Sequence, residues 1–408
     1  MSADCTARRR DALAIWKAGV DAVQPGVFMS RTVRVAEGRL WLADQAVPLD
    51  ALDSLVVVGA GKAGAAMARA LEQALGPDWM AAKRVRGLVN VIDDFADQTR
   101  PGIRFHAARS AGIPLPTEAG VAGSAAMLNL VASLGPRDLV IGLFSGGASA
   151  LLPLPVPGVT LAEKRDATAL LSKAGAAIGE LNAVRKHLSR VKGGRLAAAS
   201  RAGRWISLIL SDVIGNPVDV IASGPSSPDP ATYADALAVI RRFKLEERMP
   251  ASVMRHLARG RNGEEPETPK TLPPSIINRI AADNGLALRA AADEARARGY
   301  EVTRLADPIQ GESREVGAAL VRRLAAERQP DGRPRCLLAG GEPVVSRVAP
   351  GGRGGRCQEL ALGAYAADDA WRGCLLAAGT DGEDGPTDAA GAFCDESVRQ
   401  AARAKGLD

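Results

Sequence analysis

Aromatic residues are scarce in this chain of 408 residues, which has 6 Phe, 5 Trp and 3 Tyr. Proteins that bind single-stranded nucleic acid stack the bases on aromatic rings, so this scarcity argues against that class. The hydrophobic content of 47% is nevertheless ample for packed cores. We therefore expect a globular protein of two or three domains with aliphatic cores.

Cysteine and histidine are also few. The five cysteines form no C-x-x-C pair, and the three histidines are scattered. Zinc sites of the usual kind need paired ligands at short spacing, so such a site is excluded. We expect the cysteines to be reduced, small and buried.

No uninterrupted apolar run is long enough to cross a bilayer. The longest uncharged stretch lies between Asp138 and Glu163, and glycines and prolines break it. The N-terminus lacks the apolar core and small-residue cleavage site of a signal peptide. We expect a cytoplasmic protein without a membrane partner. Its net charge of +6 fits nucleic acid, an anionic small substrate or a general surface bias, and we favour bias.

Short apolar runs typical of buried strands alternate with helix-like segments, which predicts a mainly parallel sheet with helices on both faces. Residues 27–35 and 39–42 predict a hairpin outside this pattern. In the first part of the chain, the predicted strands are 55–58, 88–92, 139–144 and 205–210, and the predicted helices are 63–75, 117–134, 161–174 and 180–200.

The polar, proline-containing stretch 261–274 lacks periodicity and is predicted to be a linker. We therefore expect an N-terminal α/β domain over residues 1–260 and a smaller mixed α/β domain over residues 275–408. In the second domain, the predicted strands are 275–280, 301–305, 336–339 and 374–378, and the predicted helices are 283–298, 313–327 and 357–368.

A glycine-rich turn follows the first predicted strand, where Gly59, Gly61 and Gly64 form a G-x-G-x-x-G pattern at the start of a helix. Such glycines permit a tight turn, and a helix N-terminus presents free N–H groups to an anion. A dinucleotide is one candidate ligand, but the acids expected to bind its ribose come late, at Asp93 and Asp94. Lys62 inside the turn favours a phosphate or carboxylate. The alternative is a tight turn without a ligand.

A second turn of similar design follows the predicted strand 139–144 and contains Ser145, Gly146, Gly147 and Ser149. Successive backbone N–H groups in such a turn can form a nest for an anion. The absence of G-x-S-x-G disfavours a serine hydrolase, and the absence of G-x-x-x-x-G-K-[ST] excludes an ordinary P-loop kinase.

The basic stretch 182–195 lies in the predicted helix 180–200. Arg185, Ser189 and Lys192 fall at i, i+4 and i+7, so a continuous helix would place them on one face. This face either receives a carboxylate or phosphate, or is a solvated basic surface.

Carboxylates follow two predicted strands. Asp212 comes after 205–210, where open α/β sheets bind ligands, although it also suits a helix cap. Asp381 and Asp384 come after 374–378 and suit Mg²⁺, although an acidic surface loop is the alternative. Arg356, at the start of the helix 357–368, suits bidentate contact with a phosphate or carboxylate. These groups, with the glycine-rich turns, are those that phosphoryl transfer requires.

Six segments in order resemble the glycerate 2-kinase family with a MOFRL C-terminal domain, whose members often carry the name hydroxypyruvate reductase. They are GAGKAG, SGGASALL, NAVRKHLSRVKGGRLA, SDVIGNP with IASGPS, GGRGGRCQELAL and AGTDGEDGPTDAAGAF. The resemblance implies a Rossmann-like N-terminal domain, a MOFRL-type C-terminal domain and an active-site cleft between them. It also implies ATP- and Mg²⁺-dependent phosphorylation of the 2-hydroxyl of D-glycerate, by a monomer or homodimer.

The resemblance assigns residues by motif. Lys62 and Arg356 are the cations on the transferring phosphoryl group and the substrate carboxylate, with Asp212 in the catalytic set and Asp381 and Asp384 as metal ligands. Which aspartate is the base and which binds metal stays open. ATP is expected to bind at Gly59, Gly61, Gly64, Ser145, Gly146, Gly147, Ser149 and Lys192.

The chain departs from the family pattern in several places. Residues 112–117 lack a histidine and an aspartate of the family motif, Cys357 replaces an asparagine, and Asn216 replaces an aspartate. Whether this chain makes the contacts that those polar side chains form in the family is therefore an open question. Relatives usually continue into a Thr-Gly-Pro-Thr-rich tail, so we expect a truncated C-terminal domain.

Two other functions compete with the kinase. The G-x-G-x-x-G pattern alone fits an NAD(P)H-dependent hydroxypyruvate reductase. The basic stretch 185–195 fits a nucleic-acid-binding protein, although acids interleave with arginines elsewhere and no base-reading motif is present. We expect no nucleic-acid partner.

Overall fold

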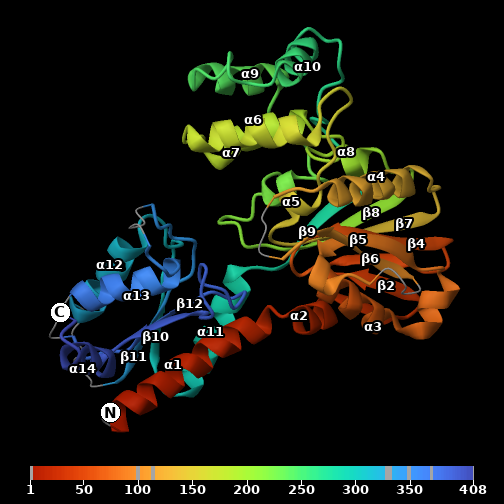
Figure 1. Ribbon diagram of the computed structural model, residues 1–408. Helices are drawn as coiled ribbons and strands as arrows, with labels where there is room; N and C mark the ends of the chain where they lie inside the picture. Colours follow the sequence, from red (N-terminus) through yellow and green to blue (C-terminus); the bar gives the residue numbers. More distant parts are fainter. Residues whose placement is uncertain are drawn as a thin grey trace. The chain divides into compact units, whose positions relative to one another are not determined.

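The computed structural model describes residues 3–97, 102–111, 115–326, 333–346, 351–367 and 371–407. The chain forms two compact units (Figure 1). Residues 25–283 form one, called here the sheet unit. Residues 1–24 and 284–408 form the other, called the terminal unit because it contains both ends of the chain.

Six parallel strands form the main sheet of the sheet unit, in the order β6-β5-β4-β7-β8-β9. Helices cover both faces of such a sheet, so its central strands are continuous apolar runs, and all seven residues of β4 are buried. The order is that of the Rossmann fold and reverses between β4 and β7. The strands are β4 (Ser54–Ala60), β5 (Arg86–Ile92), β6 (Ile103–Arg109), β7 (Asp138–Phe144), β8 (Arg204–Leu210) and β9 (Ile276–Ala282).

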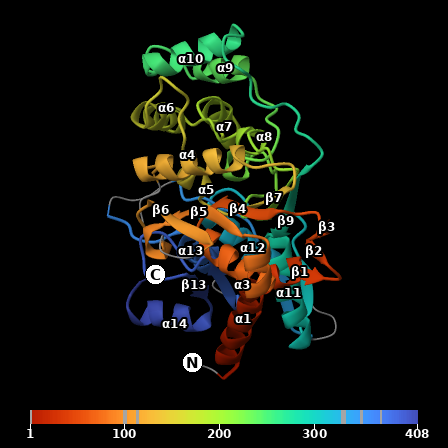
Figure 2. The same ribbon diagram turned by 90° about the vertical axis from the view of Figure 1, so that its right-hand side faces the viewer.

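Helices lie on both faces of this sheet, as the alternating pattern predicts (Figures 1 and 2). Helices α2 (Pro25–Thr32) and α3 (Gly64–Ala82) lie on one face, and α4 (Glu118–Ala132), α5 (Ala148–Leu151) and α8 (Arg195–Ala198) on the other. Gly64 allows α3 to pack closely on β5, because a Cβ atom there would lie 2.9 Å from Cγ1 of Val89. The α/β fold class is therefore confirmed.

A helical layer lies beyond α4 in both views (Figures 1 and 2). It consists of α6 (Leu161–Lys173), α7 (Ile178–His187), α9 (Tyr233–Arg242) and α10 (Ala251–Arg261). The layer has an aliphatic core of its own, built around Leu171, Val184, Leu237, Ile240 and Leu257.

The predicted helix 180–200 is wrong beyond residue 187. α7 ends at His187, and the chain then turns through Gly193 and Gly194, which have φ of +57° and +80°. These left-handed conformations favour glycine and cannot continue a right-handed helix. Ser189 and Lys192 therefore do not share a helix face with Arg185.

Two further differences concern strands. The strand β6 is absent from the predicted set because it is an edge strand, whose alternation of buried and exposed residues gives no continuous apolar run. The predicted hairpin begins late, since residues 27–32 belong to α2. A three-stranded antiparallel meander follows, with β1 (Val33–Ala36), β2 (Arg39–Leu42) and β3 (Gln45–Pro48).

The division of the chain also differs from the predicted one. β9 pairs with β8, so residues 261–274 lie within the sheet unit, which ends at Asp283. The first helix, α1 (Ala3–Ala22), belongs to the terminal unit because Ile15 shares a core with Ala291 and Ala295 of α11 (Asn284–Ala297). The packing of the N-terminal helix with residues 284–297 cannot be predicted from the order of elements along the chain.

The terminal unit contains two small sheets, a parallel β10-β11 pair and an antiparallel β12-β13 pair. Its other helices include α12 and α13, which pack against each other around Val321 and Ala361. The elements are β10 (Glu301–Arg304), α12 (Ser313–Ala326), β11 (Arg335–Leu338), α13 (Arg356–Ala367), β12 (Leu375–Ala378), β13 (Gly391–Cys394) and α14 (Glu396–Ala404). Among the described residues, no helix has the length and apolar character needed to span a membrane.

Candidate active site

The turns after β4 and β7 lie next to each other, at the point where the strand order reverses. The two strands pair along their whole length and end with Ala60 opposite Phe144. Gly59 permits this close approach, because a Cβ atom there would lie 2.3 Å from the carbonyl oxygen of Leu143. Open α/β sheets bind ligands at such a switch point, beyond the carboxyl ends of the strands.

Hydrogen bonds join the two turns. The N–H of Lys62 donates to the carbonyl oxygen of Gly146 at 2.9 Å, and the N–H of Ala63 donates to Oγ of Ser145 at 3.1 Å. Gly61 has φ of +140°, and a Cβ atom there would lie 2.1 Å from Oγ of Ser145. Only glycine fits this conformation and this approach. The two predicted turns are thus parts of one structure.

Two cationic side chains flank Gly147 in the second turn. A Cβ atom on Gly147 would lie 3.4 Å from Cγ of Lys62 and 3.8 Å from Nη2 of Arg109. Arg109 is the last residue of β6 and is 9% exposed. Sequence reasoning missed Arg109 because it missed β6. An arginine at the carboxyl end of a parallel strand is the signal that identifies it.

Asp212 lies against the same turn. It follows the end of β8 by two positions and is exposed. A Cβ atom on Gly146 would lie 2.3 Å from Oδ2 of Asp212, so the carboxylate contacts the backbone of this glycine. Lys62, Arg109 and Asp212 therefore gather around residues 146–147 from the ends of three different strands.

Ser149 connects the second turn to a buried hydrogen-bond chain. Nζ of Lys192 donates to the carbonyl oxygen of Ser149 at 3.0 Å, to its Oγ at 3.1 Å, and to the carbonyl oxygen of Ala222 at 3.3 Å. Oγ of Ser149 lies 2.9 Å from Oγ of Ser223, whose hydroxyl donates to Oδ1 of Asn182 at 3.1 Å. Lys192 is therefore a buried support of the turn.

The segment held by Lys192 has an unusual backbone. Ala222, Ser223 and Gly224 have φ of +56°, +60° and +63° in succession. Each left-handed non-glycine residue costs on the order of 1–3 kcal/mol, and such strain persists only where the surrounding structure enforces it. Lys192 is 2% exposed, and this burial lowers its pKa well below the ordinary value.

In the terminal unit, Asp384 fixes the start of α13. Its carboxylate accepts the N–H of Cys357 on Oδ1 and the N–H of Gln358 on Oδ2, both at 2.8 Å. Asp384 is 2% exposed, and the amide of Gln358 donates to Oγ1 of Thr387 in the same loop at 3.0 Å. With both oxygens used by backbone donors, Asp384 is a helix cap here. Burial raises the pKa of the Cys357 thiol to about 12, so it is not a thiolate.

Arg356 is the first residue of α13, and its guanidinium donates to Oε1 of Glu342 at 2.7 Å. This hydrogen bond is the main cause that raises the pKa of Arg356, and Asp381 adds a smaller attraction. Asp381 is exposed in the loop after β12. The fold therefore brings Arg356 and Asp381 together, with Asp384 beneath them.

Few carboxylates are available for a metal ion. Among the described residues, no group of three or more His, Cys, Asp or Glu side chains is arranged to hold one. Asp212 and Asp381 are exposed carboxylates beside cationic groups, whereas Asp384 is committed to backbone donors. A single exposed carboxylate in either unit fits an ion that arrives with phosphate oxygens and keeps several waters, as Mg²⁺ does.

One of the two acids expected for a dinucleotide is engaged by the neighbouring loop. Asp93 follows β5, and its carboxylate accepts the N–H of Ala111 at 3.0 Å and a hydrogen bond from Ser110, which lowers its pKa. A dinucleotide-binding Rossmann fold uses an acid at this position for the ribose hydroxyls. Asp93 is therefore not available for this role, whereas Asp94 is exposed.

The structure shows the surroundings of two residues that depart from the family pattern, Asn216 and Cys357. Asn216, with φ of +53°, donates its amide to Oδ2 of Asp283 at 2.8 Å, a bond that an ionised aspartate at position 216 could not make. Cys357 takes part in the α13 cap through its backbone. Of the third departure, residues 112–114 lie outside the described residues.

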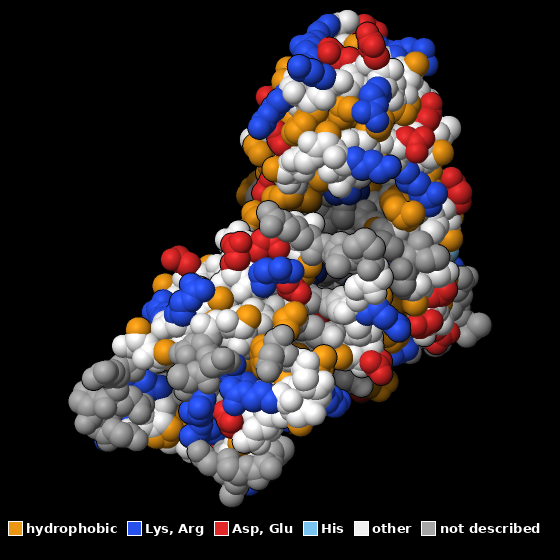
Figure 3. Space-filling model, turned by 60° about the vertical axis from the view of Figure 1, so that its left-hand side comes forward, with side chains coloured by type: hydrophobic (Ala, Val, Ile, Leu, Met, Phe, Trp, Pro, Cys, Tyr) orange, Lys and Arg blue, Asp and Glu red, His pale blue; other side chains and the backbone are white. Residues whose placement is uncertain are grey.

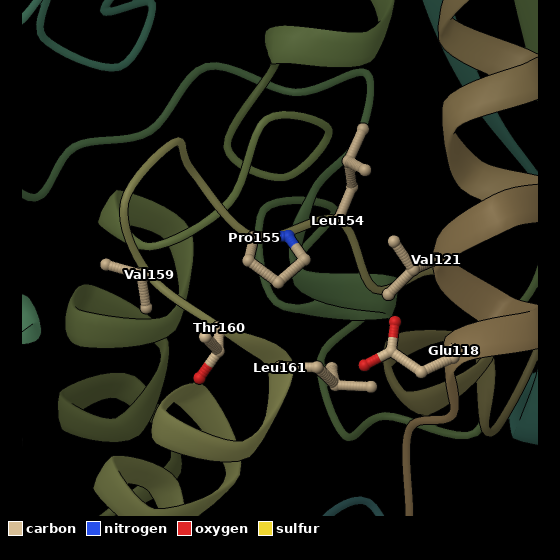
Figure 4. A pocket seen from close by; sticks show the side chains of 7 residues that line it. All are labelled: Glu118, Val121, Leu154, Pro155, Val159, Thr160 and Leu161. Carbon is tan, nitrogen blue, oxygen red and sulfur yellow. The ribbon is translucent and has the colours of Figure 1, made fainter.

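A pocket of about 340 Å³ lies apart from the two glycine-rich turns (Figure 4). Glu118 and Val121 of α4 face the segment before α6 across it. Its lining contains no lysine or arginine, and none of the predicted site residues, so it is not suited to a triphosphate. The lining residues are Glu118, Val121, Leu154, Pro155, Val159, Thr160 and Leu161.

On the face drawn in Figure 3, lysine and arginine side chains are interspersed with aspartate and glutamate. A nucleic-acid-binding surface instead gathers basic residues in one patch or stripe. On this face, the basic residues are therefore dispersed and do not form a single patch.

The fold and the two turns define a Rossmann-like α/β protein with cations and carboxylates suited to phosphoryl transfer. Residues 11–258 match the family described as "Domain of unknown function (DUF4147)", and residues 335–408 match the MOFRL family. The chain belongs to the glycerate 2-kinase family.

The relatives and a solved structure span nearly the whole chain. The glycerate 2-kinase of Pyrococcus horikoshii is 34% identical over 95% of this chain and 86% of that protein. The D-glycerate 2-kinase of Thermotoga maritima is 37% identical over 97% of this chain and 88% of that protein. A crystal structure of glycerate kinase from Thermotoga maritima matches with a TM-score of 0.80 and 35% identity, over 98% of this chain and 89% of that chain. These names give no support to a reductase.

Proposed function

We propose that this protein is an ATP-dependent D-glycerate 2-kinase that produces 2-phosphoglycerate and ADP. The observation that carries the proposal is the convergence of Lys62, Arg109 and Asp212 on the turn 145–147 at the switch point of the sheet. The names of the relatives supply the substrate. The reductase has only the glycine pattern in its favour, and Asp93 is engaged with the neighbouring loop.

In the reaction, the 2-hydroxyl oxygen of glycerate forms a bond to the γ-phosphorus while the bond from that phosphorus to the β,γ-bridging oxygen breaks. The hydroxyl proton leaves to a base. Lys62 and Arg109 stabilise the negative charge of the phosphates beside the two turns. Arg356 binds the glycerate carboxylate, which suits a guanidinium fork. Asp212 is the candidate base.

Magnesium fits this site as an ion carried by ATP. Of the two predicted ligands, Asp381 is exposed and would hold it, whereas both oxygens of Asp384 accept N–H groups. When bound, Mg²⁺ neutralises phosphate charge. Activity is expected to be lost with a chelator and restored by added Mg²⁺. The cytoplasmic location and the monomeric or dimeric state stay predictions.

A coupled assay of ADP release tests the proposal, with D-glycerate compared with glycolate, lactate and tartronate. Phosphorus NMR of the product then identifies which hydroxyl carries the phosphate. No glycerate-dependent ADP from the intact protein would overturn the proposal. Oxidation of NAD(P)H by hydroxypyruvate would establish the reductase instead.

Two variants test the site assignment. Lys62→Ala and Arg356→Ala are each expected to lower kcat by roughly 10²-fold or more, because each removes charge stabilisation of the transition state. Lys173→Ala, an exposed lysine of α6, is the control and should keep full activity. Full turnover in both site variants would show that the assignment is wrong.

A further inference from the structure

Two lysines of the sheet unit are buried and have no carboxylate partner among the residues that the structure describes. Lys164 is 7% exposed, and its Nζ donates to the carbonyl oxygen of Leu188 at 2.9 Å. Lys192 is 2% exposed, and its Nζ donates only to oxygens of Ser149 and Ala222. Removing a charge from water costs several kcal/mol, so buried charges are normally paired. Among the described residues, no side chain supplies the anion that would complete the pairing.

The acids of this region are used by other partners. Lys186, which is also buried, lies 3.3 Å from Oδ2 of Asp219 and 3.1 Å from Oδ1 of Asp229. Glu267 lies 2.7 Å from Nε2 of His187. The hydrogen-bond partners of Lys164 and Lys192 are therefore uncharged oxygens: one carbonyl for Lys164, and two carbonyls and a hydroxyl for Lys192.

A third cation, Arg185, lies in the last turn of α7 and is partly buried. Its guanidinium forms no hydrogen bond or ion pair with any residue that the structure describes. A guanidinium has five N–H donors, and a partly buried one left without an acceptor is unusual in folded proteins. Arg185 therefore has donors available for a ligand.

The three cations act on one another. Burial is the main cause that lowers the pKa of Lys164, to about 7, and of Lys192, and repulsion from Arg185 lowers both further. Burial also lowers the pKa of Arg185. Positive charges gathered in this way create a field that attracts anions.

This cluster adjoins the candidate active site. Lys192 binds Ser149 of the second glycine-rich turn directly. Asn182, three residues before Arg185 on α7, is joined to Ser149 through Ser223. Residues three apart on a helix lie on neighbouring positions of one face, about 4.5 Å apart along the axis. Arg185 therefore lies within one helical turn of Asn182, the end of the hydrogen-bond chain that supports Ser149.

We infer that Arg185 binds an oxyanion of the substrates, and that the buried Lys164 and Lys192 belong to the same cationic cluster. The inference rests on the proposed function. The oxyanion is either the carboxylate of D-glycerate or a phosphate group of ATP, since both present the same pair of acceptor oxygens to a guanidinium.

The steady-state kinetics of Arg185→Met, with Arg185→Lys beside it, distinguish the two sources. We expect the KM of one substrate to rise about tenfold or more, the loss typical of a charge-assisted contact, with a smaller change in kcat. A rise for glycerate assigns the carboxylate, and a rise for ATP assigns a phosphate. Arg185→Lys should recover part of the loss, because it keeps the charge without the fork. Arg190→Met, an exposed arginine of the same segment, is the matched control.

Calorimetry with inorganic phosphate tests the site without turnover. The wild-type protein is expected to bind phosphate, and Arg185→Met to bind it at least tenfold more weakly. Values of KM for both substrates within twofold of wild type, together with unchanged phosphate binding, would overturn the inference. If the wild type releases no ADP but binds phosphate through Arg185, the proposed function fails while the oxyanion site stands.

Discussion

The carboxylate of Asp384 accepts the backbone N–H of Cys357 at 2.8 Å, although the two residues lie 27 positions apart. This contact joins the loop after β12 to the first turn of α13, where Arg356 is the first residue. Gly355 permits it, because a Cβ atom there would lie 2.2 Å from Oδ1 of Asp384. A carboxylate at a helix N-terminus also opposes the helix dipole favourably.

Removing this cap should weaken both stability and activity. For Asp384→Ala we expect a loss of about 1–3 kcal/mol in the free energy of unfolding, because two N–H groups lose their buried acceptor. We also expect kcat to fall, since Arg356 loses its fixed position. Urea unfolding and the ADP assay measure the two effects. Asp388→Ala, an exposed aspartate of the same loop, should change neither. Wild-type stability in Asp384→Ala would contradict the capping role.

Gly146→Ala tests the contact between Asp212 and the second turn. The new methyl group would lie 2.3 Å from Oδ2 of Asp212, so the mobile carboxylate must move while the backbone stays. We therefore expect at least a tenfold fall in kcat, by analogy with the loss of one preorganised group, with little change in Tm. Gly179→Ala, in open space on α7, is the control and should be neutral or slightly stabilising. Unchanged kcat in Gly146→Ala would remove Asp212 from the mechanism.

Lys192→Met should separate activity from stability. The variant loses the three hydrogen bonds that hold Ser149 and Ala222 together. It also removes a buried charge without an acidic partner, which partly offsets the loss in stability. We expect kcat/KM to fall tenfold or more, while the free energy of unfolding changes by less than about 2 kcal/mol. A large destabilisation in urea unfolding, together with full activity of the protein that remains folded, would contradict this prediction.

The pH dependence of the free energy of unfolding should reveal the lowered pKa of Lys164. Burial, with repulsion from Arg185 and Arg195, lowers its pKa from 10.5 to about 7. Between these values the unfolded chain binds more protons at this group than the folded protein does, so this contribution to the free energy of unfolding rises with pH. Below the folded pKa, the full cost of the buried charge is present.

Lys164→Met lacks this dependence. Relative to wild type, the variant should lose its advantage in unfolding free energy, by on the order of a few kcal/mol, as the pH rises from about 7 to 10.5. Urea unfolding at several pH values measures the difference. Lys173→Met, at an exposed position, should give a curve parallel to that of wild type. A parallel curve for Lys164→Met would mean that Lys164 keeps an ordinary pKa.

Most of the secondary structure of the sheet was predictable from local sequence. The central strands are continuous apolar runs because both faces are covered, and the glycines of both turns follow directly after them. The edge strand β6 lacks that signature, and Arg109 was missed with it. The end of α7 at His187 was also missed, because residues 188–192 contain no glycine or proline and the first such break in the sequence is the pair at Gly193 and Gly194.

The roles of single charged residues could not be read from spacing. Lys192 and Asp384 both stand in motifs that suggest contact with a ligand. Each is buried, however, and its polar atoms form hydrogen bonds within the protein. Arg185 stands in a similar basic motif, but its guanidinium forms no hydrogen bond or ion pair with the described residues. Burial depends on segments that are distant along the chain, so spacing alone does not distinguish these cases.

The sequence by itself determined the α/β class, the two glycine-rich turns and the family, because these follow from local runs of residues and their order. Only the tertiary structure decided which chemical groups meet. It placed Arg109 and Asp212 at the turn of Lys62, returned the N-terminal helix to the terminal unit, and made Asp384 a cap. These results depend on strand order and packing between distant segments, which bring together residues that no local pattern connects.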